Sequence, residues 1–414
     1  MTKKNMVFPA RKVPLVLLVT LAVALSGCFS DYGGAGTLVI GLGGGGRLYV
    51  NPKEAASLEH EVILKGPGGT ITRKIFGQGT LSFELVAGEW DVKVRAIGDR
   101  PEDYDALFTG ARMLRALGWA SVEIKAGKSS MARIDMISAT EVSNWDQLDA
   151  VIDFISDFPE LLPEEIVVVK GELAFDGGTI YINRKITLMA EKNDAVIFHS
   201  DYFGNSYFNV YDNGKLTLRG DDGGRLILDG TSDFAVSESF LKIESGGRLE
   251  MYDGVILQNN ELTTVSGGAI NLTQGAFTMY GGVIRNNAAY RGGAVVLNSE
   301  STFIMEGGSI SGNEAGNVGG GVDVFNGTFD MRGGSISANS SIMAGGGVYV
   351  DTGGKFIKTG GTIYGMDAES PLGNDASSGK AVYVTQVGAS VISRPEKIID
   401  ITVDPGTKID SENG

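Results

Sequence analysis

The sequence has little cysteine, little histidine and no excess of positive charge. One cysteine among 414 residues excludes an internal disulfide. The two histidines, His60 and His199, lie far apart in the chain, which disfavours a histidine-based metal or catalytic centre. The formal net charge is −15 and no basic stripe is present, which argues against nucleic acid as a partner. From these features we expect no metal, no cofactor and no nucleic-acid ligand.

Long apolar runs are also scarce, and the clearest one lies at the N-terminus. It extends from Val13 to Leu25 behind a basic segment, and it is shorter than the ~20 residues that span a bilayer. This pattern predicts a signal peptide. The run ends in "LSGC" (residues 25–28), which resembles the lipobox of bacterial lipoproteins. The resemblance implies cleavage before Cys28, lipidation of Cys28 and attachment to the cell envelope, with Phe29 favouring the outer membrane or cell surface.

Glycine, by contrast, is abundant, and it marks a repeat. The chain has 61 glycines, and the phrase "GGVIRNNAAYRGGAVVL" (281–297) returns in similar form at Gly307 and Gly333. Each unit of about 26 residues holds three short apolar strands separated by turns. Such a unit cannot bury its apolar face alone, so the period predicts a solenoid whose coils stack on one another.

The repeats resemble the right-handed parallel β-helix of pectin-lyase-like proteins, and the Gly-Gly-Ala motifs at 267–270 and 292–295 resemble those of chlamydial polymorphic outer-membrane proteins. Upstream, residues 37–137 alternate apolar and polar positions, which predicts a β-sandwich. The run around "LSFELVAGEW" resembles Ig-like or prealbumin-like modules. Trp90 and Trp119 are two candidates for sugar stacking there, with a core position as the alternative.

Between these regions, Ser143 is a candidate N-cap of an amphipathic helix that carries Trp145, Leu148, Ile152 and Ile155 on one face. We expect this helix to cover the first coil. The fold class is therefore all-β, with an N-terminal β-sandwich, a capping helix and a right-handed parallel β-helix of about eight or nine coils. The expected organisation is a signal peptide (1–27), a tether with the lipidated cysteine (28–36), the β-sandwich (37–137), a linker with the capping helix (138–165), the parallel β-helix (166–403) and a polar tail (404–414).

One asparagine recurs in each repeat, and an amide at a coil corner can hydrogen-bond to its neighbours above and below. Because amides are neither general acids nor nucleophiles, we interpret this row as structural. It contains Asn259, Asn287, Asn313 and Asn339.

The insertion at 365–380 breaks the repeat period, and long loops on a rigid scaffold often carry function. The candidate ligand-binding residues are its acids and the tyrosines on the flanking strands: Tyr349, Asp367, Glu369, Asp375 and Tyr383. The segment "RGDDGG" (219–224) reads as a turn, with an Arg-Gly-Asp recognition triplet or an acidic calcium loop as alternatives.

Successive outward positions of the coils hold few carboxylates, so we assign no catalytic residue. The sequence favours a monomeric cell-surface lipoprotein. Its β-helix would bind a glycan or an extracellular or host protein, or serve as a structural surface. The alternative is a polysaccharide lyase or glycoside hydrolase of the pectin-lyase-like class.

Overall fold

The computed structural model describes fourteen stretches of the chain, and the statements below concern these residues. They are 34–42, 57–77, 79–99, 112–132, 134–157, 164–175, 177–199, 205–230, 237–262, 264–365, 371–385, 390–393, 401–403 and 409–410. The predicted signal peptide, Cys28, Asp367 and Glu369 lie outside the described residues. No helix of the described residues has the length and apolar character needed to cross a membrane.

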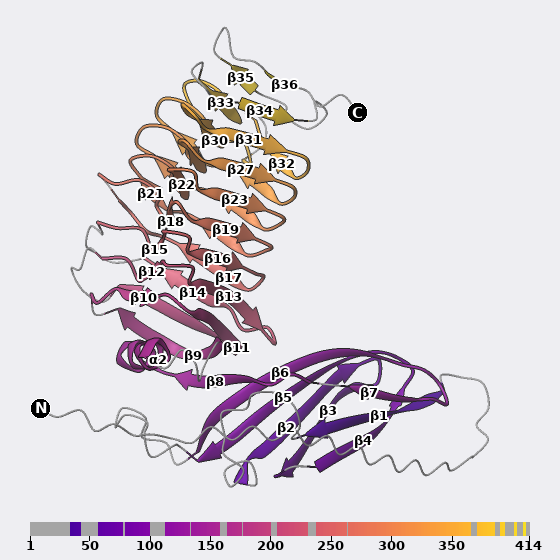
Figure 1. The fold of residues 1–414 in the computed structure, drawn as a ribbon. Coiled ribbons are helices and arrows are strands. Elements are labelled where there is room, and N and C mark those ends of the chain that lie inside the picture. The colour runs from indigo at the N-terminus through magenta and orange to yellow at the C-terminus, as the bar shows by residue number, and fades with distance from the viewer. Residues whose placement is uncertain are drawn as a thin grey trace, which may run out of the picture.

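The N-terminal unit consists of two sheets that share one core (Figure 1). The first sheet has the order β4 (Gly79–Val86), β1 (Ala35–Leu42) and β7 (Ser129–Ala132). The second runs β3 (Gly69–Phe76), β2 (Glu59–Gly66), β5 (Gly88–Asp99), β6 (Arg112–Ile124) and β8 (Ile137–Val142). Alternate apolar residues from both sheets fill the space between them, including Leu38, Phe83, Val62 and Trp90. Trp90 is buried and donates a hydrogen bond from Nε1 to the Val86 carbonyl over 2.9 Å, so it is a core residue.

Strand β8 connects this unit to the solenoid. It pairs antiparallel with β6 and parallel with β9 (Glu164–Phe175), the first strand of the solenoid. Leu114 and Leu117 of β6 pack in one cluster with Ile166 and Val168 of β9. Backbone pairing and apolar packing therefore both cross the junction between the two units.

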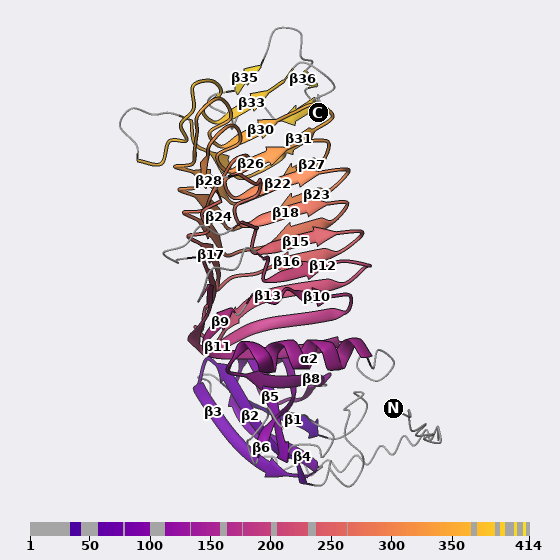
Figure 2. The same cartoon turned by 90° about the vertical axis from the view of Figure 1, so that its left-hand side faces the viewer.

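Helix α2 (Trp145–Asp157) covers the open end of the solenoid, as expected, and Figure 2 shows it lying across the first coils. Trp145 packs edge-on against Phe175 with ring centroids 4.9 Å apart. The N-cap is Asn144 and not Ser143, because Asn144 Oδ1 accepts the backbone N–H of Gln147 over 2.9 Å. The Gln147 side chain in turn accepts from the Ser143 backbone N–H over 2.8 Å. The cap is thus shifted by one residue from the predicted position.

The C-terminal unit is a parallel β-solenoid of about eight turns, which confirms the all-β solenoid architecture expected from the repeats. After β9 and β11 (Lys185–His199), successive coils contribute strands to three columns, and a short two-residue strand is added in the middle coils. Among the described residues, the third column ends at Thr362–Ile363, before the other two.

The first column is a nine-stranded sheet of β10 (Ile180–Ile182), β12 (Phe208–Val210), β15 (Leu241–Glu244), β18 (Ile270–Thr273), β22 (Val295–Asn298), β26 (Val322–Val324), β30 (Val348–Val350), β33 (Val382–Val384) and β35 (Ile401–Val403). The second has β13 (Lys215–Asp221), β16 (Arg248–Met251), β19 (Ala276–Met279), β23 (Thr302–Met305), β27 (Thr328–Met331), β31 (Lys355–Lys358), β34 (Ser390–Ser393) and β36 (Ile409–Asp410). The third has β14 (Leu226–Asp229), β17 (Val255–Gln258), β20 (Val283–Arg285), β24 (Ser309–Ser311), β28 (Ser335–Ser337) and β32 (Thr362–Ile363). The short strands are β21 (Ala288–Ala289), β25 (Glu314–Ala315) and β29 (Ser340–Ser341).

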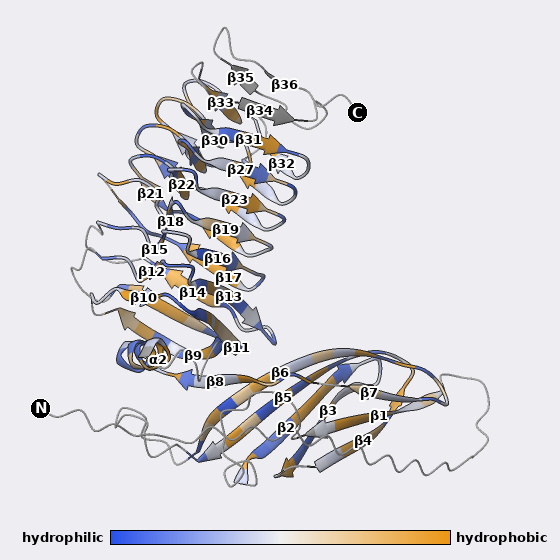
Figure 3. Cartoon of the chain, in the orientation of Figure 1, coloured by the Kyte–Doolittle hydropathy of each residue, from blue (hydrophilic) through white to orange (hydrophobic). Residues whose placement is uncertain are grey.

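In-register pairing places equivalent side chains directly above one another in the core. The rings of Phe277, Phe303, Phe329 and Phe356 stack with successive centroid distances of 4.5, 4.7 and 5.2 Å. Hydrophobic and hydrophilic residues intermingle along the strands of both units in Figure 3, as expected when alternate side chains point inward and outward. The outward positions are therefore fixed by a rigid core, which lets them form a defined surface.

Candidate functional site

The outer face of the first column carries the two tyrosines predicted from the sequence. Val348 and Val350 of β30 are buried, so Tyr349 between them points outward, and Tyr383 occupies the same register on β33. The two rings stack almost parallel, with centroids 5.6 Å apart and an interplanar angle of 6°. Each ring therefore covers one face of the other.

Arg291 extends onto this face from the loop between β21 and β22. Its Nε lies 2.7 Å from Asp323 Oδ2, its Nη2 lies 3.2 Å from Asp323 Oδ1, and Nη2 also lies 2.5 Å from Asp351 Oδ2. The guanidinium carbon is 5.7 Å from the ring centre of Phe325 and 5.8 Å from that of Tyr349. Cation–π attraction and a two-point carboxylate contact thus hold one arginine in place. We call the group the outer-face cluster: Arg291, Asp323, Phe325, Tyr349, Asp351 and Tyr383.

Burial and ion pairing shift the pKa values of Asp323 and Arg291 in opposite directions. Burial raises the pKa of Asp323 to about 6, although the hydrogen bonds from Arg291 lower it. Burial would lower the pKa of Arg291, but the bonds to Asp323 and Asp351 outweigh it and raise the pKa. The hydrogen bonds from Arg291 to Asp323 and Asp351 therefore offset part of the cost of burying these charges, and the pair is a fixed structural element.

This geometry does not suit hydrolysis or elimination on a polysaccharide. Asp323 has 0% of its side chain exposed and Asp351 has 17%, so neither offers the free carboxylate that acid–base chemistry needs. Phe325, in contrast, is 42% exposed. Aromatic and arginine side chains in such an arrangement are typical of binding surfaces.

Only part of the predicted ligand site comes together. Asp375 lies beside the short strand β29, where it bridges to Ser340, and its carboxylate pairs with Lys380 over 2.9 Å. Asp367 and Glu369 are outside the described residues. The sequence pattern did not reveal Arg291, Phe325 or Asp351 as site residues. Arg291 lies in a repeat turn and reaches across two coils, so the repeat spacing does not show which residues it contacts.

The asparagine row forms a hydrogen-bonded ladder, but its first member is Asn260 and not Asn259. The backbone N–H of each ladder residue donates to the Oδ1 of the next: Asn260 to Asn287 over 3.1 Å, and Asn287 to Asn313 and Asn313 to Asn339 over 3.0 Å each. Asn339 continues to Asn374 over 2.9 Å. Asn259 instead has a positive φ of 62° and bonds to Asp229. The insertion thus contributes Asn374, which sequence spacing did not reveal.

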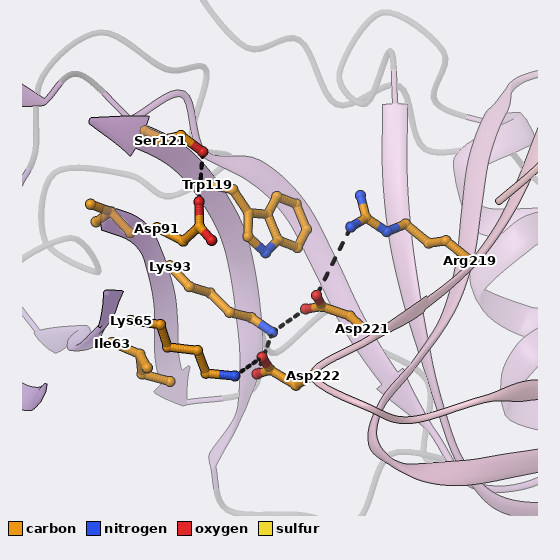
Figure 4. Close-up of a pocket in the computed structure, with 11 residues that line it drawn as sticks. Ile63, Lys65, Asp91, Lys93, Trp119, Ser121, Arg219, Asp221 and Asp222 are labelled. Carbon is orange, nitrogen blue, oxygen red and sulfur yellow. Dashed lines mark hydrogen bonds and ion pairs between the residues drawn. The ribbon is translucent and has the colours of Figure 1, made fainter. Parts of the chain in front are cut away.

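A second polar group lies where the two units meet (Figure 4). Lys93 of β5 forms ion pairs with Glu191 of β11 and with Asp221, and its Nζ is 3.4 Å from Asp222 Oδ2. One oxygen of each carboxylate lies within 4.8 Å of the others, a spacing that would suit a metal ion. The Lys93 ammonium already pairs with all three carboxylates.

The bonds to Asp221 and Glu191 decide the charge of this lysine. Burial would lower the pKa of Lys93, but these bonds outweigh it and raise the pKa. These ion pairs therefore connect the two units, and we call Lys93, Glu191, Asp221 and Asp222 the ionic clamp. The Arg-Gly-Asp triplet at 219–221 is part of it, and the chain turns directly afterwards at Asp222 and Gly223, both with positive φ.

Comparison with known proteins gave no match to a family model, to a curated sequence or to a solved structure.

Proposed function

We propose that this protein is a lipoprotein of the bacterial cell envelope, lipidated at Cys28, whose solenoid serves in adhesion to an extracellular protein. The N-terminal unit, in this proposal a β-sandwich, is a spacer between the membrane and the solenoid. The observation that carries the proposal is the outer-face cluster. Tyrosine and arginine are enriched among the residues that dominate protein–protein binding energy, and here their positions are set by a stacked core.

The form of the surface favours a macromolecule over a small ligand. The cluster sits on the face of a parallel sheet, whereas small-molecule sites are concave. The Tyr349–Tyr383 stack and the guanidinium over Tyr349 cover ring faces that a sugar would need. These rings therefore support protein contact better than the glycan stacking expected from sequence.

The position of the cluster along the molecule also supports adhesion. Figure 1 shows β30 and β33 near one end of the solenoid and the N-terminal unit at the other. Eight coils at ~4.8 Å each extend roughly 40 Å. A protein anchored at its N-terminus would thus hold the cluster away from the membrane.

The adhesion proposal is tested by binding of the full-length protein to immobilised fibronectin, laminin and collagen. Loss of Phe325 and Tyr349 in a Phe325→Ala/Tyr349→Ala variant should weaken binding at least about tenfold, since hot-spot residues contribute ~2 kcal/mol or more. The matched control is Tyr252→Ala/Tyr280→Ala, which removes another exposed stacked pair with centroids 4.7 Å apart. Binding to none of the three proteins, or an equal loss in both variants, would refute the proposal.

The anchor is tested by metabolic labelling with palmitate. Wild-type protein should incorporate the label and sediment with membranes, whereas Cys28→Ala should do neither, because the thiol is the lipid acceptor. A labelled Cys28→Ala protein would contradict lipidation at this residue.

A further inference from the structure

Among the described residues, the N-terminal unit has three edge strands, β3, β7 and β4, and they differ in how well they are protected. Proteins protect the unpaired N–H and C=O groups of an edge with short strands, prolines or charges that point inward. Strand β7 has only four residues. In β3, Arg73 lies between Ile71 and Ile75, which pack against the core, so its charge is on the inward side. Strand β4 has eight residues, no proline and no inward charge.

The outer edge of β4 is open. All eight of its residues pair with β1 in one continuous register, and no described strand pairs with it on the other side. The residues that point away from the core are all exposed: Thr80, Ser82, Glu84 and Val86. Figures 1 and 2 both show β4 on the side of the N-terminal unit away from the solenoid. A strand added here would therefore extend the sheet away from the solenoid.

The direction of the backbone groups shows which residues can pair at this edge. The N–H of Ala87 donates to the Gly34 carbonyl over 3.1 Å, across the pairing with β1. Because successive residues of a strand direct these groups to opposite sides, the even-numbered residues 80 to 86 direct theirs to the open edge. The Val86 carbonyl already accepts from Trp90 Nε1. Three residues therefore keep both groups available: Thr80, Ser82 and Glu84.

We infer that two copies of this protein pair through β4, antiparallel, about a twofold axis at Ser82. In this register Ser82 pairs with Ser82 of the second copy, and Thr80 pairs with Glu84 of the second copy. The N–H and C=O groups of all three available residues then obtain partners. A register centred on Phe83 would need the occupied Val86 carbonyl, and one centred on Glu84 would place two like charges opposite each other.

The side chains of β4 also favour a second copy as the occupant. On the core side, Leu81 of one copy would face Phe83 of the other, so apolar contact continues across the axis. On the outer side, each Glu84 would face a threonine. The same surface serves both copies, so the contact closes at two molecules and leaves no further β4 edge open.

The dimer would carry two outer-face clusters, one on each solenoid, in place of the monomer expected from sequence. Linking two sites raises the apparent affinity for a surface that presents many partner molecules. The pairing uses neither the outer-face cluster nor Cys28. It therefore does not depend on the adhesion proposal or on the lipid anchor.

The association is tested by sedimentation velocity of the full-length protein in detergent solution, which should show a dimer at about 100 µM. Ser82→Pro removes the N–H at the axis, and since this N–H faces the open edge, pairing with β1 is kept. This variant should be a monomer with the circular dichroism spectrum of wild type. Ser82→Ala is the matched control, because it keeps the N–H and should remain dimeric.

Cysteine cross-linking tests the register and does not depend on the proline variant. In Cys28→Ala/Ser82→Cys, the two Cα atoms would be ~5.5 Å apart, within the ~4.4–6.8 Å range of disulfides. Mild oxidation should therefore give a covalent dimer. Cys28→Ala/Thr72→Cys is the control, since Thr72 is exposed on the protected strand β3 and its thiol should not cross-link.

A monomer at the concentration tested, or a dimer that Ser82→Pro leaves intact, would overturn the inference. Equal cross-linking through positions 82 and 72 would do the same. Slow hydrogen exchange at Ser82 in a monomer would place another polypeptide on the edge and exclude a second copy. Phe325→Ala/Tyr349→Ala should remain dimeric, and the Ser82→Pro monomer should still bind the extracellular protein, so each proposal can fail without the other.

Discussion

At the scale of single residues, two neighbouring positions at a coil corner have different roles. The first residue makes the turn, and the second is the asparagine of the ladder. The residue before each of the first four ladder asparagines has a positive φ: 62° at Asn259, 54° at Asn286, 65° at Gly312 and 53° at Ala338. Asparagine and glycine adopt this left-handed conformation readily, whereas alanine does so at a free-energy penalty of ~1–2 kcal/mol. Ala338 is therefore a strained residue in an otherwise regular corner.

Replacing Ala338 with glycine should stabilise the solenoid. Relief of the left-handed strain outweighs the extra freedom of glycine in the unfolded chain, so we expect the free energy of unfolding to rise by about 0.5–1 kcal/mol. Urea unfolding followed by circular dichroism measures this change. Ala288→Gly is the control, since Ala288 lies in β21 without a positive φ and its replacement should destabilise the protein. Destabilisation by Ala338→Gly would show that the corner is not strained.

At the scale of elements, the asparagine ladder connects successive coils where the strands are shortest. Asn313 Nδ2 donates to the carbonyl of Ile284 over 3.1 Å and to Asn339 Oδ1 over 2.9 Å. Its own Oδ1 accepts from both the backbone N–H and the Nδ2 of Asn287, each over 3.0 Å. One buried side chain thus satisfies groups in the coils on either side of it.

Asn313→Ala should be strongly destabilising, because it leaves several of these buried groups without a partner. We expect a loss of about 2–4 kcal/mol in the free energy of unfolding. The matched control is Asn317→Ala in the same coil, whose side-chain amide donates to the surface hydroxyl of Tyr290 over 3.1 Å and should contribute less than about 0.5 kcal/mol. Comparable losses in the two variants would mean that the ladder does not hold the coils together.

The elements were predictable from sequence to the extent that their signal is periodic. Inward positions recur with the repeat, so the strand columns and the covering helix follow from spacing alone. The ladder was misplaced by one residue at Asn259 because asparagines occupy both 259 and 260, and only the hydrogen bonds distinguish the two.

The outer-face cluster was only partly predictable from the sequence. Tyr349 and Tyr383 share a register, but Arg291 reaches Asp323 and Asp351 across coils, which no periodicity encodes.

At the scale of the whole molecule, the junction decides whether the two units act as one body. Lys93 and Arg95 of the N-terminal unit form ion pairs with Glu191 of the solenoid. The backbone of β8 also pairs with β6 of the N-terminal unit and with β9 of the solenoid. The pKa of Glu191 is lowered, because the lysine and arginine charges outweigh the effect of burial. Relative movement of the units would break these buried pairs, which is costly when one partner is left unpaired.

One buried acid at this junction should make stability depend on pH. Glu165 of β9 accepts a hydrogen bond from Thr140 Oγ1 of β8 over 2.9 Å, and its Oε2 has no partner among the described residues. Burial raises the pKa of Glu165 from 4.5 to about 7, although Ser138, Thr140 and Arg115 act to lower it. The folded state thus holds this proton more tightly than the unfolded chain does. Its contribution to stability is complete below pH 4.5 and is lost as the pH rises through 7, up to about 3 kcal/mol in all.

Glu165→Gln should remove this pH dependence, because the amide stays neutral. Urea unfolding at pH 5 should find the variant and wild type similar in stability, whereas at pH 8 the variant should be more stable by up to about 3 kcal/mol. Glu172→Gln is the matched control, since Glu172 lies exposed on the same strand and its replacement should leave the wild-type pH profile unchanged. If Glu165→Gln and Glu172→Gln show the same pH dependence of the free energy of unfolding, Glu165 is ionised in the folded protein. Any pH dependence of stability at the junction would then come from the buried ion pairs of the ionic clamp.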